Sequence, residues 1–128
     1  MRLTSITLRV ADLSRARKFY EQTLGLKLKV AFPGMAVLDA GYVTISLIQH
    51  GAAAAGVKLA ASSGLLAQTE LVMEVSDIHG SFRDLKGRGV PFEGELRAIS
   101  GDSTRQLLGA PFRDPDGHNL ALTGWVTP

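Results

Sequence analysis

The sequence predicts an α+β fold built from two copies of one module, each with the order strand, helix and three strands. The first observation is a repeated stretch, because ITLRVADL at residues 6–13 returns as LVMEVSDI at residues 71–78. Each copy alternates inward and outward residues up to a Val, and the Asp that follows can begin a helix. The second observation is the offset of 65 residues between Val10 and Val75, about half of the 128-residue chain. A duplicated module produces such an offset.

Composition and charge narrow the range of functions. A chain with 45% hydrophobic and 20% charged residues is typical of a soluble globular protein. Its net charge is only +2, and no basic stripe with interleaved aromatic residues is present, so we expect no nucleic-acid partner. There is no Cys, which excludes disulfides and thiolate chemistry. No membrane-length apolar run and no signal peptide are recognisable, so we expect no membrane partner and a cytoplasmic location.

The first module is assigned to residues 1–50. Asp12 is expected to cap its helix, and Gly25 to end it. Ala40 and Gly41 are expected in the turn between its last two strands. Its predicted strands are residues 4–10, 27–30, 35–39 and 42–48.

The second module is assigned to residues 69–128, after a linker over 51–68 that is rich in Ala, Gly and Ser. Asp77 is expected to cap its helix, and Pro115 and Gly117 are placed as a tight turn requires. Its predicted strands are residues 71–75, 93–99, 106–112 and 118–125. The second module thus repeats the order of the first.

Four stretches together resemble the vicinal oxygen chelate superfamily, which contains glyoxalase I, extradiol dioxygenases and bleomycin-resistance proteins. They are V-x-D-L after the first strand, Phe19-Tyr20 in the helix, Leu24-Gly25-Leu26 at its end, and FRDPDGH at residues 112–118. The resemblance covers nearly the whole chain. It implies two βαβββ modules with curved mixed sheets that enclose a cleft, with the helices packed outside. It also implies a homodimer.

The resemblance further implies where a metal ion would bind. In the metal-dependent members, four strands each supply one cleft-facing His or Glu, and the corresponding residues here are Ser5, Ser46, Glu70 and Ala121. A catalytic divalent site needs about three protein ligands, so we expect no metal ion and no other cofactor. The histidines His50, His79 and His118 are expected to be solvated polar residues. A relocated metal site that uses His50 and Glu70 is the alternative.

Strand alternation predicts the side chains that face the cleft and bind a small-molecule ligand. They are Ser5, Thr7, Arg9, Ser46, Ile48, Glu70, Val72, Glu74, Ala121, Thr123 and Trp125. Arg9 and Glu74 hold equivalent positions in the two copies, which favours an ion pair, although Arg9 could instead bind a carboxylate or phosphate of the ligand. Trp125 is the only Trp and either caps the core or provides a stacking platform for a flat ligand.

These residues favour a metal-independent protein of the bleomycin-resistance type that sequesters an aromatic or cationic small molecule, as antibiotic-resistance members of the superfamily do. The alternative is an enzyme of the lyase or isomerase type, also without the ordinary metal, in which Glu70 is the general acid or base. A third hypothesis is an accessory module that binds a protein partner along apolar strands at 27–30 or 93–99. The sequence leaves open whether any reaction is catalysed.

Overall fold

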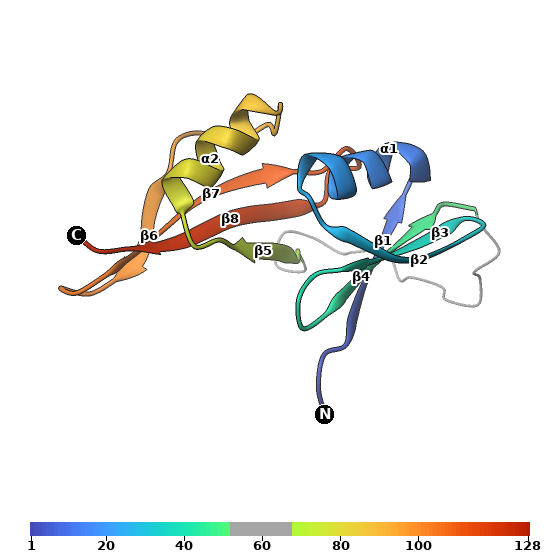
Figure 1. Cartoon of the computed structure of the whole chain (residues 1–128), viewed down its shortest axis with the longest axis horizontal. Coiled ribbons are helices and arrows are strands. Elements are labelled where there is room, and N and C mark those ends of the chain that lie inside the picture. The colour runs from blue at the N-terminus through green and yellow to red at the C-terminus, as the bar shows by residue number, and fades with distance from the viewer. Residues whose placement is uncertain (52–67) are drawn as a thin grey trace. The chain divides into compact units, whose positions relative to one another are not determined.

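The structure is a computed structural model that describes residues 1–51 and 68–128 (Figure 1). The chain divides into two compact units, Met1–Ser62 and Ser63–Pro128. The linker predicted over residues 51–68 lies almost wholly outside the described residues. Within residues 1–51 and 68–128, no helix has the length and apolar character needed to cross a bilayer.

The first unit contains a four-stranded mixed sheet with the strand order β1-β4-β3-β2. β1 pairs with β4 in parallel, whereas the pairs β3–β4 and β2–β3 are antiparallel. Its elements are β1 (Ser5–Val10), α1 (Leu13–Arg17), the π-helical turn η1 (Lys18–Thr23), β2 (Lys27–Phe32), β3 (Met35–Asp39) and β4 (Thr44–Gln49).

The second unit repeats this topology, with the strand order β5-β8-β7-β6 and a parallel pair between its first and last strands. Its elements are β5 (Glu70–Glu74), α2 (Ile78–Gly87), β6 (Arg97–Gly101), β7 (Gln106–Arg113) and β8 (Asn119–Val126). Each unit therefore has the order βαβββ. The duplicated α+β module predicted from the sequence is confirmed.

The two helix starts are built in the same way. The Asp12 side chain accepts a hydrogen bond from the Arg15 backbone N–H at 3.2 Å, and the Asp77 side chain accepts one from the Gly80 N–H at 3.0 Å. Each carboxylate thus satisfies a backbone donor that the first helical turn leaves without a partner. The predicted caps are confirmed at both positions.

The first helix differs from the single α-helix expected between Asp12 and Gly25. After five residues of α1, the chain widens into η1, and the Leu24 N–H donates to the Phe19 carbonyl at 2.9 Å. The Phe19 and Tyr20 rings meet edge to face at a centroid distance of 5.3 Å, and Tyr20 is fully buried. The wide turn therefore keeps the Tyr20 side chain in the core.

The second strand of the second module starts later than predicted. Residues 93–96 form a loop, and β6 begins at Arg97. The Phe92 ring packs against Phe82 and Phe112, at centroid distances of 4.5 and 5.3 Å, and Gly94 has a φ of 125°. The contacts of the Phe92 ring and the left-handed conformation of Gly94 prevent residues 93–96 from pairing in the sheet. The strand predicted over residues 93–96 is therefore wrong.

In each unit, one face of the sheet packs on the helix and the other face is open. α1 contacts β3 and β4, and α2 contacts β8. Alternate residues of the strands are buried under the helices, as a period of two requires. The largest of them are Leu8, Val10, Leu38, Ile45 and Leu47 in the first unit and Leu71, Phe112, Leu120 and Leu122 in the second.

The helix of the second unit packs tightly over Gly124 of β8. A Cβ atom at residue 124 would lie 2.7 Å from the Cβ of Ile78 and 2.9 Å from the carbonyl oxygen of Val75. We therefore predict that Gly124→Ala lowers the free energy of unfolding by about 1–3 kcal/mol, because α2 has to shift. Urea denaturation measures this loss.

The matched control is Gly87→Ala, at the last residue of α2, where an added Cβ meets no atom within 4 Å. Its expected effect on the free energy of unfolding is within about 0.5 kcal/mol. Equal stability of the two variants would contradict the close packing at Gly124.

Candidate functional site

The open face of the first sheet carries a patch of hydroxyl groups. In the parallel pair, Ser5 lies beside Thr44 and Thr7 beside Ser46. The hydroxyl oxygens of Ser5 and Ser46 are 3.4 Å apart, and Ser46 is buried. The next pair along the strands is Arg9 with Ile48. Five of the predicted ligand-binding residues, Ser5, Thr7, Arg9, Ser46 and Ile48, therefore share one face.

The same face becomes apolar towards its edge strand, β2. Val30 pairs with Val37, which pairs with Ser46, and Phe32 pairs with Met35 in the same row as Ile48. Val30 and Phe32 are exposed. The edge itself is protected against pairing with another strand, because a bulge interrupts the pairing with β3 between Leu28 and Val30.

The open face of the second sheet combines acidic and apolar side chains. Glu70, Val72 and Glu74 of β5 lie beside Asn119, Ala121 and Thr123 of β8, and Trp125 follows on β8. Val72 is 58% exposed and Trp125 36%, whereas Ala121 and Thr123 are buried. The predicted residues of this module thus lie on one face, with Val72 and Trp125 as its exposed apolar groups.

Ile99 adds a third apolar side chain to this face, which sequence analysis missed. A Cβ on Gly109 would collide with the Ile99 side chain and touch the Thr123 methyl, so Ile99 lies over the glycine. A bulge between Ala98 and Ser100 re-aims the strand at this point. Ile99 is 57% exposed. No local signal in the sequence marks the bulge, although Gly109 in a strand indicates a close approach.

Arg105 is a second residue that sequence analysis missed. Its guanidinium carbon lies over the Trp125 ring, 4.0 Å from the ring centroid. Arg105 stands two residues before Leu107, which pairs with Trp125, so strand alternation puts Arg105 and Trp125 on one face. The two-residue spacing between Arg105 and Leu107 is the sequence signal that could have placed Arg105 on this face. Trp125 is therefore an open-face residue whose ring already holds a cation.

The four positions that the resemblance implies for metal ligands, Ser5, Ser46, Glu70 and Ala121, do not fit a catalytic divalent ion. Ser5 and Ser46 bond to each other through their hydroxyls, and Ala121 has no donor atom. Glu70 is the single carboxylate of the set. Within residues 1–51 and 68–128, no group of three or more His, Cys, Asp or Glu side chains could hold a metal ion. His50 and His79 are exposed.

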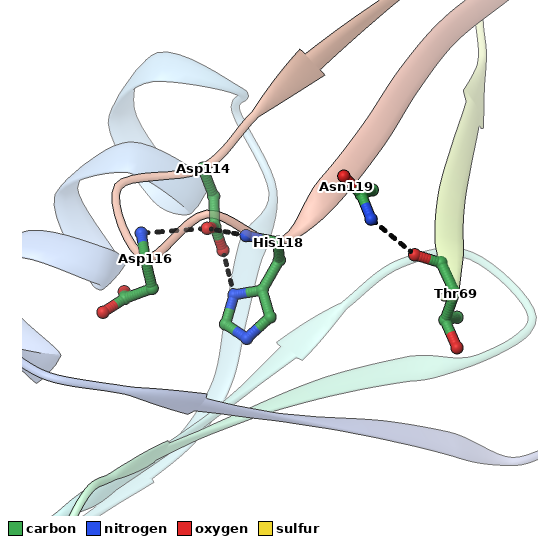
Figure 2. A network of polar contacts seen from close by, with 5 residues as sticks. All are labelled: Thr69, Asp114, Asp116, His118 and Asn119. Atoms are coloured by element: carbon green, nitrogen blue, oxygen red, sulfur yellow. Dashed lines mark hydrogen bonds and ion pairs between the residues drawn. The ribbon is translucent and has the colours of Figure 1, made fainter. Parts of the chain in front are cut away.

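Glu70 lines a hollow of about 190 Å³ at the start of β5. Glu93 and Asn119 also line it, and the Asn119 amide donates to the Thr69 carbonyl at 3.4 Å (Figure 2). Glu93 accepts from the Arg113 side chain at 3.1 Å. Glu70 therefore stands at a small recess whose lining is partly polar and partly apolar, with Pro111, Phe112 and Leu120 as the apolar residues. The predicted ion pair between Arg9 and Glu74 joins residues of different units and stays a prediction.

His118 is clamped by a buried carboxylate, in contrast to the solvated histidine predicted from the sequence. Figure 2 shows the Asp114 side chain between β7 and β8, where it accepts from the backbone N–H groups of Asp116 and His118 at 3.0 and 2.8 Å. His118 Nδ1 lies 2.7 Å from the second Asp114 oxygen. These bonds brace the predicted turn at Pro115 and Gly117, which is confirmed.

This arrangement raises the pKa of His118 above its usual value of 6.5. The hydrogen bond to Asp114 is the main cause, and the charges of Asp114 and Asp116 act in the same direction, while burial opposes them. The bonds of Asp114 to Asp116 and His118 stabilise the turn between β7 and β8. We therefore do not count these residues among the candidate ligand-binding groups.

Comparison with known proteins agrees with this architecture. The family model of the Glyoxalase/Bleomycin resistance protein/Dioxygenase superfamily matches residues 2–122, and the chain belongs to this superfamily. A search of the curated proteins found no match.

Among solved structures, an integron cassette protein from the mobile metagenome of V. cholerae is 23% identical, with a TM-score of 0.74 over 97% of this chain and 94% of that one. A similar cassette protein from V. pseudocholerae is 25% identical, with a TM-score of 0.74 and the same coverage. Lactoylglutathione lyase from Agrobacterium tumefaciens is 17% identical, with a TM-score of 0.73 over 96% of this chain and 92% of that one. These likenesses support the fold.

The Asp114–His118 pair makes a pH-dependent contribution to stability. Because the pKa of His118 is raised on folding, its stabilising effect is complete below about pH 6.5, the unfolded value, and is lost as the pH rises through the folded pKa. We predict that the stability difference between the native protein and His118→Gln is larger at acidic than at alkaline pH. Urea denaturation across this range measures it.

An NMR titration of the His118 ring gives the independent check. Asp114→Asn should lower the His118 pKa, because the amide no longer stabilises the imidazolium. An unchanged pKa in that variant would show that Asp114 is not the cause of the shift.

Proposed function

We propose that this chain is a metal-independent small-molecule-binding protein, and that it holds an aromatic or cationic ligand on the open face of its second sheet. The observation that carries the proposal is the exposure of Val72, Ile99 and Trp125 on that face. Val72 lies on the edge strand β5, Ile99 on the opposite edge strand β6, and Trp125 on β8 between them. Exposed large apolar side chains on one sheet face favour ligand binding. Sequestration requires affinity alone, and no catalytic group.

Charges at the border of this surface fit the same proposal. Glu74 of β5 pairs with Thr123, two residues before Trp125 on β8, whereas Glu70 pairs with Asn119, six residues before Trp125. The Glu74 carboxylate can bind a cationic group of a ligand, while the apolar side chains contact its flat part. The homodimer and the cytoplasmic location expected from the sequence stay predictions.

The proposal predicts that flat aromatic molecules bind without a metal ion. Acridine-9-carboxamide is a suitable neutral probe, and the fluorescence of Trp125, the only Trp, reports its binding. Val72→Ser and Ile99→Ser should each weaken binding about fivefold, because each removes apolar contact area. Tyr42→Ser is the control, since Tyr42 is fully exposed in the β3–β4 turn.

Chelation distinguishes metal-independent binding of the probe from binding that requires a metal ion. Binding should be unchanged after treatment with EDTA. The proposal fails if chelation abolishes binding, or if Val72→Ser and Ile99→Ser bind the probe as tightly as the Tyr42 variant does.

The second candidate function is a lyase or isomerase in which Glu70 is the general base. The observation in its favour is the recess of about 190 Å³ that Glu70 shares with Asn119 and Glu93. A positioned carboxylate can remove a proton from carbon next to a carbonyl group. This candidate needs Glu70 to reach the ligand from the edge of the open face.

Exchange of ligand protons with deuterium oxide tests this candidate. The candidate predicts that the protein accelerates exchange of the methyl protons of acetophenone, and that Glu70→Gln abolishes the acceleration while binding of the ketone persists. Glu95→Gln, at an exposed loop residue, is the control. Exchange no faster than in buffer, measured by NMR, rules the candidate out.

A further inference from the structure

We infer that Arg105 and Trp125 together form a recognition point for a planar anion, such as the carboxylate of a flat aromatic ligand. The inference rests on the aromatic alternative of the proposed function, and it gives that ligand an anionic group in place of a cationic one. It is carried by the position of one guanidinium group, by the way its backbone is held, and by its free hydrogen-bonding edge.

The guanidinium is supported by the indole from one side. The Arg105 carbon lies 4.0 Å from the centroid of the Trp125 ring, which is a close cation–π contact. A guanidinium presents its flat face to a ring and its N–H groups in its own plane. Stacking on Trp125 therefore leaves the donor edge available to a second group.

The backbone of Arg105 is fixed before any ligand binds. The Asp102 carboxylate accepts from the Thr104 hydroxyl at 2.6 Å and from the N–H groups of Thr104 and Arg105 at 2.8 and 3.1 Å. These bonds hold the pKa of Asp102 below its ordinary value. The Asp102 N–H donates in turn to the Arg105 carbonyl at 2.9 Å.

Gly101 makes this tight turn possible. Its φ is 150°, and a Cβ at this residue would lie 2.6 Å from the Arg105 carbonyl oxygen. The β6–β7 hairpin thus presents Arg105 from a closed and strongly hydrogen-bonded loop. Preorganisation of this kind lowers the entropy cost of ligand binding.

Arg105 also differs from the paired arginines of the described chain. Arg17, Arg88 and Arg113 each have a carboxylate partner, namely Glu21, Asp84 and Glu93. Within residues 1–51 and 68–128, no carboxylate lies within ion-pair distance of the Arg105 guanidinium. Its acidic neighbour in the hairpin, Asp102, uses its Oδ1 oxygen on the Thr104 side chain and on the N–H groups of Thr104 and Arg105. The Arg105 donors therefore fit a carboxylate from a ligand.

The surroundings of the pair favour an aromatic body on that carboxylate. Leu107 pairs with Trp125 across the sheet, and Ile99 lies over Gly109 on the same face. Glu74 of β5 pairs with Thr123 of β8, and β8 pairs in turn with β7. Two strand spacings, about 10 Å, therefore separate the β5 strand from β7. A ligand anion at Arg105 would thus contact apolar side chains and stand away from the carboxylates of β5.

The experiment compares three ligands with one ring system and different charge: acridine-9-carboxylate, neutral acridine-9-carboxamide and cationic 9-aminoacridine. Titrations follow the fluorescence of Trp125. We expect the carboxylate to bind the native protein about tenfold more tightly than the carboxamide, as a charged hydrogen bond to an exposed arginine provides. Arg105→Gln should remove this preference and leave the carboxamide affinity within about twofold.

Arg113→Gln is the matched control, because Arg113 is another arginine of the same sheet but is paired with Glu93. It should keep the preference for the carboxylate. Urea denaturation of both variants tests whether the role of Arg105 is purely structural. If the guanidinium only shields the indole, Arg105→Gln changes the free energy of unfolding but leaves the order of the three ligand affinities unchanged.

The outcomes separate this inference from the proposed function. Equal affinities for carboxylate and carboxamide, or tightest binding of 9-aminoacridine, would overturn the anion site while leaving a binding protein in place. A preference that survives Arg105→Gln would also overturn it. If none of the three molecules binds in titration calorimetry, both the inference and the proposed function fail for flat aromatic ligands.

Discussion

The structure depends on the parallel pairing between the first and the last strand of each module. In the first unit this pairing sets Leu8 beside Leu47, and in the second unit it sets Leu71 beside Leu120. Because side chains alternate along a strand, a slip by one residue would turn every buried side chain outward, so the helix-covered face holds the register. The register in turn decides which residues reach the open face. Ser5, Thr7 and Arg9 lie there in one unit, and Glu70, Val72 and Glu74 in the other.

The two open faces share a topology and differ in chemistry. The first offers a hydroxyl patch with a buried Ser46 and an apolar margin on β2. The second offers exposed apolar groups bordered by carboxylates and by the Arg105 guanidinium. A duplicated scaffold therefore presents two dissimilar surfaces, because the open face of a sheet tolerates substitutions that the packed face does not. Membership in the superfamily accounts for the scaffold, and the ligand is decided by these exposed side chains.

Polar groups of the second unit fall into two classes with separate tasks. Asp114 is buried, and its oxygens are used by the backbone of the turn and by His118. Such a satisfied carboxylate stabilises the connection between β7 and β8. Arg105, in contrast, is exposed and held from beneath by an aromatic ring. The hairpins at the two ends of β7 thus carry one structural network and one group available for recognition.

The sequence by itself determined the repeat, both Asp caps, the Pro115–Gly117 turn and the open-face residues of β1, β4, β5 and β8, because these follow from interactions between near neighbours and from the period of a strand. Only the tertiary structure decided the π turn before Gly25, the late start of β6, the clamp on His118 and the contact of Arg105 with Trp125. Three of these depend on a ring or a charge that meets a partner from another turn or strand: Tyr20 in the core, Phe92 against Phe82, and Arg105 above Trp125. The physical reason is that periodicity gives the direction of a side chain, whereas its partner is set by packing between elements that are distant in the chain.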